Sequence, residues 1–282
     1  MMTIQAKNPV KRASSLHASK LSNPPGSKEQ KGSGKVWLVG AGPGDPELLT
    51  LKAMRVIAEA DVVLYDSLIS DDILALLPRQ CARIHTGKRC GAHKMTQQDI
   101  NKALLSAAGK YQRVVRLKGG DPFIFGRGGE EMEYLQQRGV EVDIVPGITA
   151  AGGCAAAAGI PLTHRDYGNA LVLHSGHSKF NEFSPCQNPT RVFYMGLRQA
   201  GPITAQLLQE GLHESTPVAL ITNGTLANQQ VFKGVLMDLA YLAERYLKSE
   251  SDGPGLIIVG EVAAMARSNK ELQAELNAQA VA

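Results

Sequence analysis

The strongest constraint on the fold is an alternation between short apolar runs and helical segments over residues 35–147. Short apolar runs bounded by turn residues are typical of buried strands, and the segments between them carry apolar residues at helical spacing. This alternation predicts an α/β domain built on a largely parallel sheet. Because ligands bind such sheets at the carboxyl ends of the strands, the turns there are the first candidates for a site.

The same pattern gives the expected elements of the first half. We expect strands at residues 36–39, 62–65, 82–86, 113–117 and 140–145. The helices between them are expected at residues 46–59, 71–77, 96–108 and 129–138. Asp45 followed by Pro46 predicts the start of the first helix, because Asp is a good cap and Pro suits the first helical position.

The second half predicts a different order of elements. It begins with an Ala-rich helix at 149–158, followed by strands near 170–174, 191–195 and 217–222. A turn and strand at 225–234, as in a hairpin, and a helix at 235–247 come next. The last strand is expected at 256–259, with a helix after it. We expect four regions: a tail at 1–34, an N-terminal α/β domain at 35–149, a C-terminal α/β domain at 150–267 and a helical tail at 268–282.

The composition is that of a globular protein. The chain has 282 residues, 44% of them hydrophobic and 20% charged, which excludes fibrous and disulfide-stapled classes and suits two domains. The most apolar stretch, residues 150–162, is too short to span a membrane and is interrupted by three glycines. We therefore expect no membrane-spanning helix.

The net charge of +4 belongs to the first 34 residues, which carry six Lys or Arg and one acid. The rest of the chain is close to neutral, which argues against a broad nucleic-acid-binding face. We interpret the Ser- and Lys-rich tail as a disordered, solvated extension. An organellar transit peptide is the alternative, because such peptides share this basic, acid-poor character.

Cysteine and histidine positions give no sign of a metal or disulfide site. Cys81, Cys90, Cys154 and Cys186 show no paired spacing, so we expect reduced thiols and a cytoplasmic protein. His174 and His177 follow an expected strand and need not converge on a metal, and Ser175 between them lacks the GxSxG context of a hydrolase nucleophile.

The first strand-end turn, residues 40–45, reads GAGPGD. A dinucleotide fingerprint would need glycine where Asp45 stands, and a carboxylate there would repel a pyrophosphate at the helix start. NAD and FAD are therefore disfavoured as cofactors. ATP is disfavoured as well, because no Walker motif surrounds Lys88. The glycines still allow a ligand close to the backbone, and a plain strand-to-helix turn is the alternative.

Two further motifs follow the strand at 113–117. Residues 119–122 read GGDP, in which the acid could accept hydrogen bonds from a ribose, with an ordinary β-turn as the alternative. Residues 126–131 read GRGGEE, in which Arg127 can hold a carboxylate in two-pronged geometry and Glu130 lies near a helix N-terminus. Ordinary helix-start chemistry is the alternative here.

A basic loop stands out in the otherwise neutral body. It gathers five cationic or titratable side chains within ten residues: His85, Lys88, Arg89, His93 and Lys94. Such a loop suits a small polyanionic substrate. A solvated charged loop is the alternative.

Taken together, these motifs resemble the tetrapyrrole methylase superfamily and, within it, the uroporphyrinogen-III C-methyltransferases. The resemblance covers about residues 35–267. It rests on segments that occur in one order: GAGPGDP at 40–46, YD at 65–66, GKR at 87–89, GGDPF at 119–123, GRGGEE at 126–131, PGITA at 146–150 and GIPLTHR at 159–165.

This resemblance implies two α/β domains with mostly parallel sheets and an active-site cleft between them. It also implies a homodimer, S-adenosylmethionine as methyl donor with S-adenosylhomocysteine as its product, and no metal. The implied reaction methylates uroporphyrinogen III at ring carbons 2 and 7 to give precorrin-2, for siroheme, cobalamin or haem d1 synthesis. Some relatives carry a fused dehydrogenase–ferrochelatase module, and we expect the stand-alone form here.

The resemblance also assigns roles to matching residues. Methyl-donor binding falls to Pro43, Gly119, Gly120, Asp121, Ile124, Thr149, Ala150, Met195 and Gly224. Asp66 and Lys88 match positions assigned as proton acceptor and donor. Substrate binding or catalysis falls to Arg127, Glu130 and Arg165, with Arg89 beside them in the basic loop.

The chemistry of methyl transfer to a pyrrole carbon supports some of these roles. The reaction requires alignment of the two reactants and then a base that removes a proton. The resemblance suggests Asp66 or Arg127 as the base, and arginine holds its proton too tightly to serve easily. A structural role of the Asp66 carboxylate is the alternative. We expect Lys88, Arg89, Arg127 and Arg165 to bind the carboxylates of uroporphyrinogen.

Two alternatives to this function remain open. One is another methylase of the superfamily, acting on a later precorrin or even on RNA or protein. The other is a tetrapyrrole- or nucleoside-binding module without activity. Methyl turnover separates the binding module from the enzymes, and the substrate separates the enzymes from each other.

Overall fold

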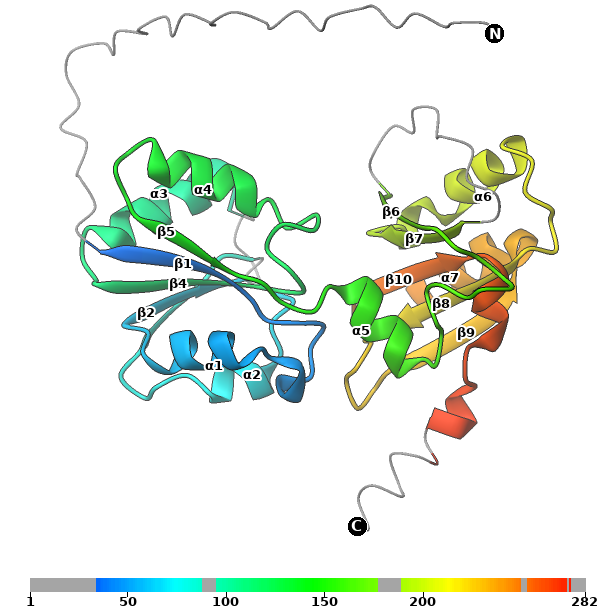
Figure 1. Cartoon of the computed structure of the whole chain (residues 1–282), viewed down its shortest axis with the longest axis horizontal. Coiled ribbons are helices and arrows are strands. Elements are labelled where there is room, and N and C mark those ends of the chain that lie inside the picture. Colours follow the sequence, from blue (N-terminus) through cyan, green and yellow to red (C-terminus); the bar gives the residue numbers. More distant parts are fainter. Residues whose placement is uncertain (1–33, 88–94, 177–188, 250–252, 273, 275–282) are drawn as a thin grey trace, which may run out of the picture.

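The computed structural model describes residues 34–87, 95–176, 189–249, 253–272 and 274. These residues form two five-stranded sheets. Figure 1 shows them as two lobes, joined where the chain passes from β5 (Val142–Val145) to α5 (Ala150–Ala157). The predicted boundary between domains at 149/150 stays a prediction, although the connection between the sheets lies in the same stretch.

The first sheet is entirely parallel, as predicted. Its strand order is β3-β2-β4-β1-β5, with every neighbouring pair parallel. The other strands are β1 (Lys35–Gly40), β2 (Val62–Tyr65), β3 (Ala82–His85) and β4 (Arg113–Lys118). All five carboxyl ends therefore meet at one edge of the sheet, which is where the glycine-rich motifs of the first half lie.

Helices cover both faces of this sheet (Figure 1). They are α1 (Leu51–Ala58), α2 (Asp71–Ala75), α3 (Gln97–Ala108) and α4 (Gly128–Gln136). One apolar cluster packs under α1 and α2 and the other under α3 and α4. Hydroxyl residues cap three of the helices: Thr50, Ser70 and Thr96.

The predicted first helix is divided into two pieces. Asp45 caps a short 3-10 helix, η1 (Pro46–Leu48), through a hydrogen bond from the Glu47 amide, as the Asp-Pro pair predicts. The backbone is then extended at Leu49 and Thr50, and Thr50 starts α1. A continuous helix over 46–59 is therefore wrong, because the extended backbone at Leu49 and Thr50 and a second cap interrupt it.

The second sheet corrects the expectation of mostly parallel strands. Its order is β6-β7-β10-β8-β9, and only β6 (Leu171–Ser175) and β7 (Thr190–Tyr194) run parallel. The pairs of β10 (Gly255–Val259) with β7 and β8 (Pro217–Thr222) are antiparallel. The predicted hairpin is present, because β9 (Gln230–Val235) pairs antiparallel with β8.

The helices around the second sheet differ from the prediction in two places. The first is α6 (Ala200–Gln209), which the sequence analysis did not predict, since Gly201 and Pro202 stand in its first turn, where proline is tolerated. The second is the segment after β10, where a short 3-10 helix, η4 (Glu261–Met265), comes first and α-helical backbone follows at residues 269–272. The remaining elements are η2 (Leu197–Gln199), η3 (Leu236–Asp238) and α7 (Leu239–Leu247).

Several sequence predictions fall outside the described residues. These are the N-terminal tail up to residue 33, the basic loop from Lys88 to Lys94, and His177. Cys81 and Cys154 are buried free thiols, whereas Cys90 and Cys186 lie outside the described ranges. None of the described helices combines the length and the apolar character that crossing a membrane requires.

Candidate active site

Three glycine backbones pack together at the carboxyl ends of β1, β4 and β5. A Cβ atom on Gly147 would lie 2.3 Å from the Gly120 carbonyl oxygen, and one on Gly40 would lie 2.5 Å from the Gly147 nitrogen. Gly120 also has a positive φ of 67° and exchanges two backbone hydrogen bonds with Gly42. Side chains are therefore excluded from this point, and the three strand ends meet through their backbones alone.

The start of α5 brings candidate residues from both lobes together. Pro43 packs against Gly153, where a Cβ would lie 2.4 Å from the proline ring. On its other side, α5 meets Gly224, where a Cβ would lie 2.3 Å from Cys154 Sγ. The turn around Pro43 contacts the second lobe again, because the Asp45 amide donates to the Thr225 hydroxyl at 3.1 Å.

Tyr194, at the end of β7, forms hydrogen bonds with residues at the start of α5. Its hydroxyl lies 2.6 Å from Thr149 Oγ1 and accepts a hydrogen bond of 2.9 Å from the Ala151 amide. Burial raises the pKa of this phenol, so it stays protonated and can donate to Thr149. Its ring also packs on Phe125, with 4.9 Å between centroids. Thr149 and Ala150 thus lie beside Met195, which follows Tyr194 in the chain.

Removing the Tyr194 hydroxyl is expected to destabilise the protein. In Tyr194→Phe the buried Ala151 amide loses its acceptor, and an unpaired buried donor costs about 1–3 kcal/mol. The free energy of unfolding, measured in denaturant, should fall by that amount. Tyr241→Phe, at an exposed tyrosine of α7, should leave it unchanged, and an equal loss in both variants would contradict the role of this hydrogen bond.

Strained backbone conformations gather in the loops around this point. Among the described residues, five non-glycine residues have positive φ: Phe125, Arg127, Met195, Asn223 and Thr225. All five lie in loops that follow β4, β7 or β8, and two of them are predicted site residues. Such strain persists only where the surrounding structure enforces it, and it concentrates at functional sites.

Asp121 organises the loop after β4. Its Oδ1 accepts the Phe123 amide at 2.8 Å and its Oδ2 accepts the Gly147 amide at 3.0 Å. Asp121 thus stabilises its own turn, as in the β-turn alternative, and the ribose contact, which would use its remaining lone pairs, stays a prediction. The following residues, from Phe123 to Phe125, are exposed apolar side chains.

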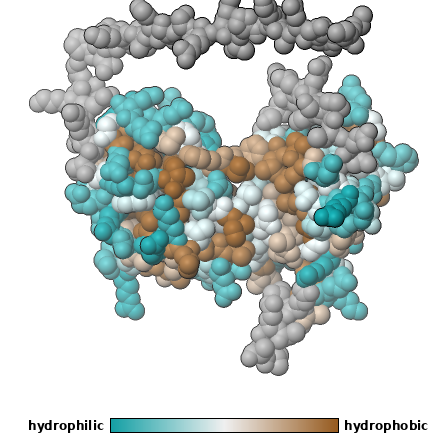
Figure 2. Space-filling view, in the orientation of Figure 1, coloured by the Kyte–Doolittle hydropathy of each residue, from teal (hydrophilic) through white to brown (hydrophobic). Residues whose placement is uncertain are grey.

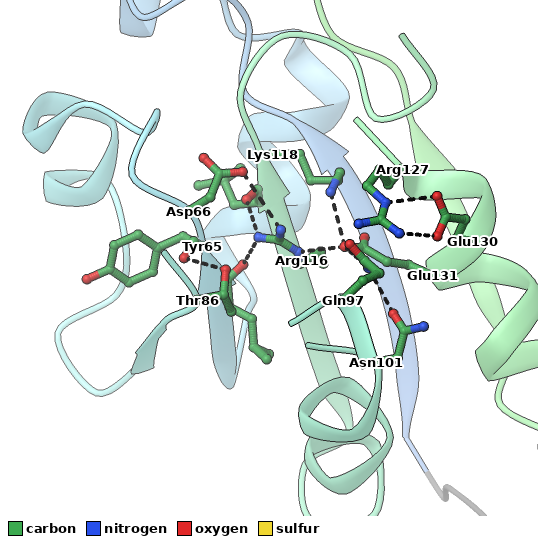
Figure 3. Close-up of polar contacts among 12 residues, drawn as sticks. Tyr65, Asp66, Thr86, Gln97, Asn101, Arg116, Lys118, Arg127, Glu130 and Glu131 are labelled. Carbon is green, nitrogen blue, oxygen red and sulfur yellow. Dashed lines mark hydrogen bonds and ion pairs between the residues drawn. The ribbon is translucent and has the colours of Figure 1, made fainter. Parts of the chain in front are cut away.

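A buried charge cluster lies below this loop (Figure 3). Glu131, in the first turn of α4, is fully buried and accepts hydrogen bonds from Arg116 Nε at 3.2 Å and Lys118 Nζ at 3.1 Å. Burial and the neighbouring Arg116 lower the pKa of Lys118, while Glu131 opposes that shift. We call these three residues the buried charge cluster.

Asp66 lies at the edge of the buried charge cluster. It follows β2, and its Oδ2 is 3.8 Å from Arg116 Nη2 while its Oδ1 accepts the Leu68 amide at 3.0 Å. Its side chain is 24% exposed, so it can meet a ligand from outside. Leu68 also packs over Gly119, where a Cβ would lie 2.9 Å from the leucine, so the Asp66 loop borders the glycine turn.

Arg127 and Glu130 form a two-pronged ion pair at the start of α4. Arg127 Nε and Nη2 donate to the two Glu130 oxygens at 2.8 and 2.6 Å. The pair raises the pKa of Arg127 and lowers that of Glu130, although both side chains are about half exposed. Three of the five guanidinium N–H groups remain for another carboxylate.

Three predicted site residues remain, namely Arg165, Lys88 and Arg89. Arg165 is exposed at the tip of a tight loop closed by paired hydrogen bonds between His164 and Gly168. Lys88 and Arg89 lie outside the described residues. Within the described ranges, no group of three or more His, Cys, Asp or Glu side chains is arranged to hold a metal ion.

The sequence analysis missed four residues at the centre of the site: Arg116, Lys118, Glu131 and Tyr194. One signal was available for the first two, because they stand among apolar residues in the part of the strand that should be buried on both faces. A buried cation requires a partner, and the nearby GRGGEE motif supplies one. No comparable signal marked Tyr194.

The surface between the lobes is hollowed, and apolar side chains appear on both sides of the hollow (Figure 2). Exposed apolar residues in loops at the strand ends include Leu68, Phe123, Ile124, Ile148 and Met195. The site thus combines exposed apolar side chains, closely packed glycine backbones and charged groups from the first lobe. This mixture suits a ligand with both apolar and ionised parts.

Comparisons with known proteins agree with this arrangement. The family of tetrapyrrole (corrin/porphyrin) methylases matches residues 35–240. Siroheme synthase 2 of Cronobacter sakazakii is 52% identical over 237 residues, which cover 82% of this chain and 51% of that protein. The chain thus spans about half the length of the curated relatives it matches.

Solved structures show the same fold. The uroporphyrin-III C-methyl transferase of Thermus thermophilus, complexed with S-adenyl homocysteine, is 39% identical, with a TM-score of 0.69 over 82% of this chain and 99% of that chain. A cobalt precorrin-4 methyltransferase is 27% identical, with a TM-score of 0.69 over 81% of this chain and 95% of that chain.

Proposed function

The chain belongs to the tetrapyrrole (corrin/porphyrin) methylase family, and from that premise we propose that it methylates uroporphyrinogen III. Methyl groups from S-adenosylmethionine would be placed on carbons 2 and 7, giving precorrin-2. Relatives whose names carry this activity or a siroheme synthase activity support the proposal. The 39% identity to the uroporphyrin-III enzyme, against 27% to the precorrin-4 enzyme, favours the earlier substrate.

The residues at the strand ends fit S-adenosylmethionine. The strand ends beside Thr149 and Ala150 present backbone alone at Gly40, Gly120 and Gly147, because neighbouring backbone atoms occupy the positions that Cβ atoms would take. We propose that this backbone surface and the start of α5 hold the donor, with Pro43, Gly119, Asp121, Ile124, Met195 and Gly224 around it. When bound, the donor supplies an electrophilic methyl group on a sulfonium.

Charged groups of the first lobe fit the substrate. Uroporphyrinogen carries carboxylates on every pyrrole ring, and Arg127 keeps N–H groups available for one of them beside Glu130. Lys88, Arg89 and Arg165 are proposed as further carboxylate partners. The exposed apolar residues in the loops at the strand ends, among them Phe123 and Leu68, would contact the macrocycle itself.

Asp66 is proposed to remove the proton that the methylated pyrrole carbon must lose. Its Oδ2 lies 3.8 Å from Arg116 Nη2, and its Oδ1 accepts a hydrogen bond from the Leu68 amide, so the carboxylate is held in one orientation. Lys88 is proposed as the proton donor on family grounds. The remaining rate enhancement comes from aligning the two reactants, because in-line displacement depends on their geometry.

One observation carries the proposal. Leu68, whose amide donates to the Asp66 carboxylate, packs on Gly119, so the proposed base borders the glycine turn that is proposed to hold the donor. The proposal is tested by incubating the protein anaerobically with methyl-labelled donor and, separately, uroporphyrinogen III or a later precorrin. Label in the first substrate supports it. Label only in the second would indicate another methylase, and donor binding without transfer would indicate a binding module.

Replacing Arg127 with Lys is expected to raise the KM for uroporphyrinogen by about tenfold or more, because one charge-assisted contact worth roughly 1.5–3 kcal/mol is lost with the fork. Steady-state kinetics on labelled methyl transfer measure this change. The matched control is Arg55→Lys on the exposed face of α1, which should behave like the wild type. Unchanged KM in Arg127→Lys would remove Arg127 from substrate binding.

Assembly and location remain part of the same proposal. We propose a homodimer in the cytoplasm, on the resemblance to the family. The domain division at 149/150 is proposed as well, because the chain crosses between the two sheets there. Sedimentation of the purified protein tests the oligomeric state directly.

A further inference from the structure

Glu131 is a buried carboxylate that the proposed mechanism does not use. It is fully buried, and its Oε1 accepts three hydrogen bonds, from Gln97 Nε2, Arg116 Nε and Lys118 Nζ, at 3.1–3.2 Å. Its other oxygen, Oε2, is buried and has no partner among the described residues. Burying a carboxylate with one unpaired oxygen costs folding free energy, so its presence requires a reason.

Stability alone is a weak reason for such a group. Replacing a buried ion pair by apolar side chains of similar volume is often neutral or stabilising, since desolvation offsets the attraction between the charges. Apart from the exposed Arg113 at its start, the strand that carries Arg116 and Lys118 is otherwise apolar and buried, so apolar side chains could have filled these two positions as well. The buried charge cluster is therefore better explained by what it holds in place.

Arg116 connects Glu131 to Asp66 (Figure 3). Its Nε donates to Glu131, its Nη1 donates to the Leu64 and Leu117 carbonyls, and its Nη2 lies 3.8 Å from Asp66 Oδ2. Because the guanidinium is planar and rigid, fixing two of its nitrogens fixes the direction of the third. The position of Asp66 Oδ2 thus depends on the contact between Arg116 and Glu131.

We propose that Glu131 is a positioning residue for the methyl transfer, acting through Arg116 on the Asp66 carboxylate. The inference rests on the proposed function, because it assumes that Asp66 takes the proton. It assigns no contact with substrate or donor to Glu131 itself. Removing Glu131 should therefore affect turnover and leave donor binding unchanged.

The test compares Glu131→Gln with Glu133→Gln, an exposed glutamate two residues further along α4. We expect Glu131→Gln to lower kcat by about 10- to 100-fold, the size of effect that small misplacement of a reacting group produces. The KM for donor and the calorimetric Kd for S-adenosylhomocysteine should stay within about twofold of the wild type. Glu133→Gln should match the wild type in all three quantities.

The decisive arm repeats Glu131→Gln in an Asp66→Asn background. If Glu131 acts through Asp66, adding Glu131→Gln to Asp66→Asn should lower kcat by less than about threefold, because the effects of coupled residues are not additive. An equal loss in both backgrounds would overturn the inference, and so would full activity of the single variant. Arg116→Lys provides a second variant if Glu131→Gln does not fold, with the same non-additivity expected.

The two proposals fail in different ways. A wild-type protein that transfers no methyl group to uroporphyrinogen would overturn the proposed function and this inference with it. A wild-type protein that is active, with additive losses in the variants, would overturn only the positioning role.

Discussion

Replacing Asp66 with Asn is expected to lower methyl transfer by about 10²- to 10⁴-fold, the usual contribution of a general base. Asn keeps the Oδ1 that accepts the Leu68 amide, so the loop should hold its shape. What is lost is the group that can take a proton and the charge that faces Arg116. Rapid-quench measurement of labelled methyl transfer under anaerobic conditions reports the chemical step.

The binding of S-adenosylhomocysteine to Asp66→Asn should equal that of the wild type, since no donor contact is removed. Asp72→Asn, at an exposed acid in the first turn of α2, is the matched control and should retain full turnover. If Asp66→Asn turned over within about twofold of the wild type, a different group would have to take the proton.

The second large effect is expected at Gly147. In Gly147→Ala the new Cβ would stand 2.3 Å from the Gly120 carbonyl oxygen, and neither backbone can move without shifting a strand end. Overpacking of this kind costs about 1–3 kcal/mol of folding free energy. The shift also displaces the proposed donor surface, so the Kd for S-adenosylhomocysteine should rise by about tenfold or more.

Denaturant unfolding and isothermal calorimetry measure these two consequences for Gly147→Ala. Gly201→Ala is the matched control, because a Cβ there meets nothing within 4 Å and the residue lies in α6. It should leave donor binding unchanged and stabilise the protein by up to about 1 kcal/mol. Wild-type affinity in Gly147→Ala would refute the glycine surface as the donor site.

The first lobe could be predicted from the sequence because its strands are buried on both faces. Continuous apolar runs at 36–39 and 62–65 are local signals, and the helices between them leave only parallel pairing. The second sheet offered no such rule. Its short strands predict a sheet, but nothing in residues 217–222 or 256–259 says that the two pair antiparallel.

The candidate site was predictable where a motif is contiguous. Residues 40–45 and 119–122 signalled close backbone approach, and the structure stacks their glycines against Gly147. The contacts that join the lobes were not predictable, because Tyr194 meets Thr149 across 45 residues of chain. Spacing within one motif carries no information about such a pair.

The partners of charged residues that are distant in the chain could not be predicted either. Glu131 appeared as the last letter of a helix-start motif, where a solvated carboxylate is the ordinary expectation. Its burial against Arg116 follows only from the packing of α4 on β4, with 15 residues between the two. The pairing of Arg127 with Glu130 is local, by contrast, and both residues were predicted to belong to the site.

The central claim is that this chain methylates uroporphyrinogen III twice. The most direct measurement is the mass of the product after anaerobic incubation of the purified chain with S-adenosylmethionine and uroporphyrinogen III. We expect the substrate to gain two methyl groups. A product that carries no added methyl group, while the protein binds the donor tightly, would contradict the claim.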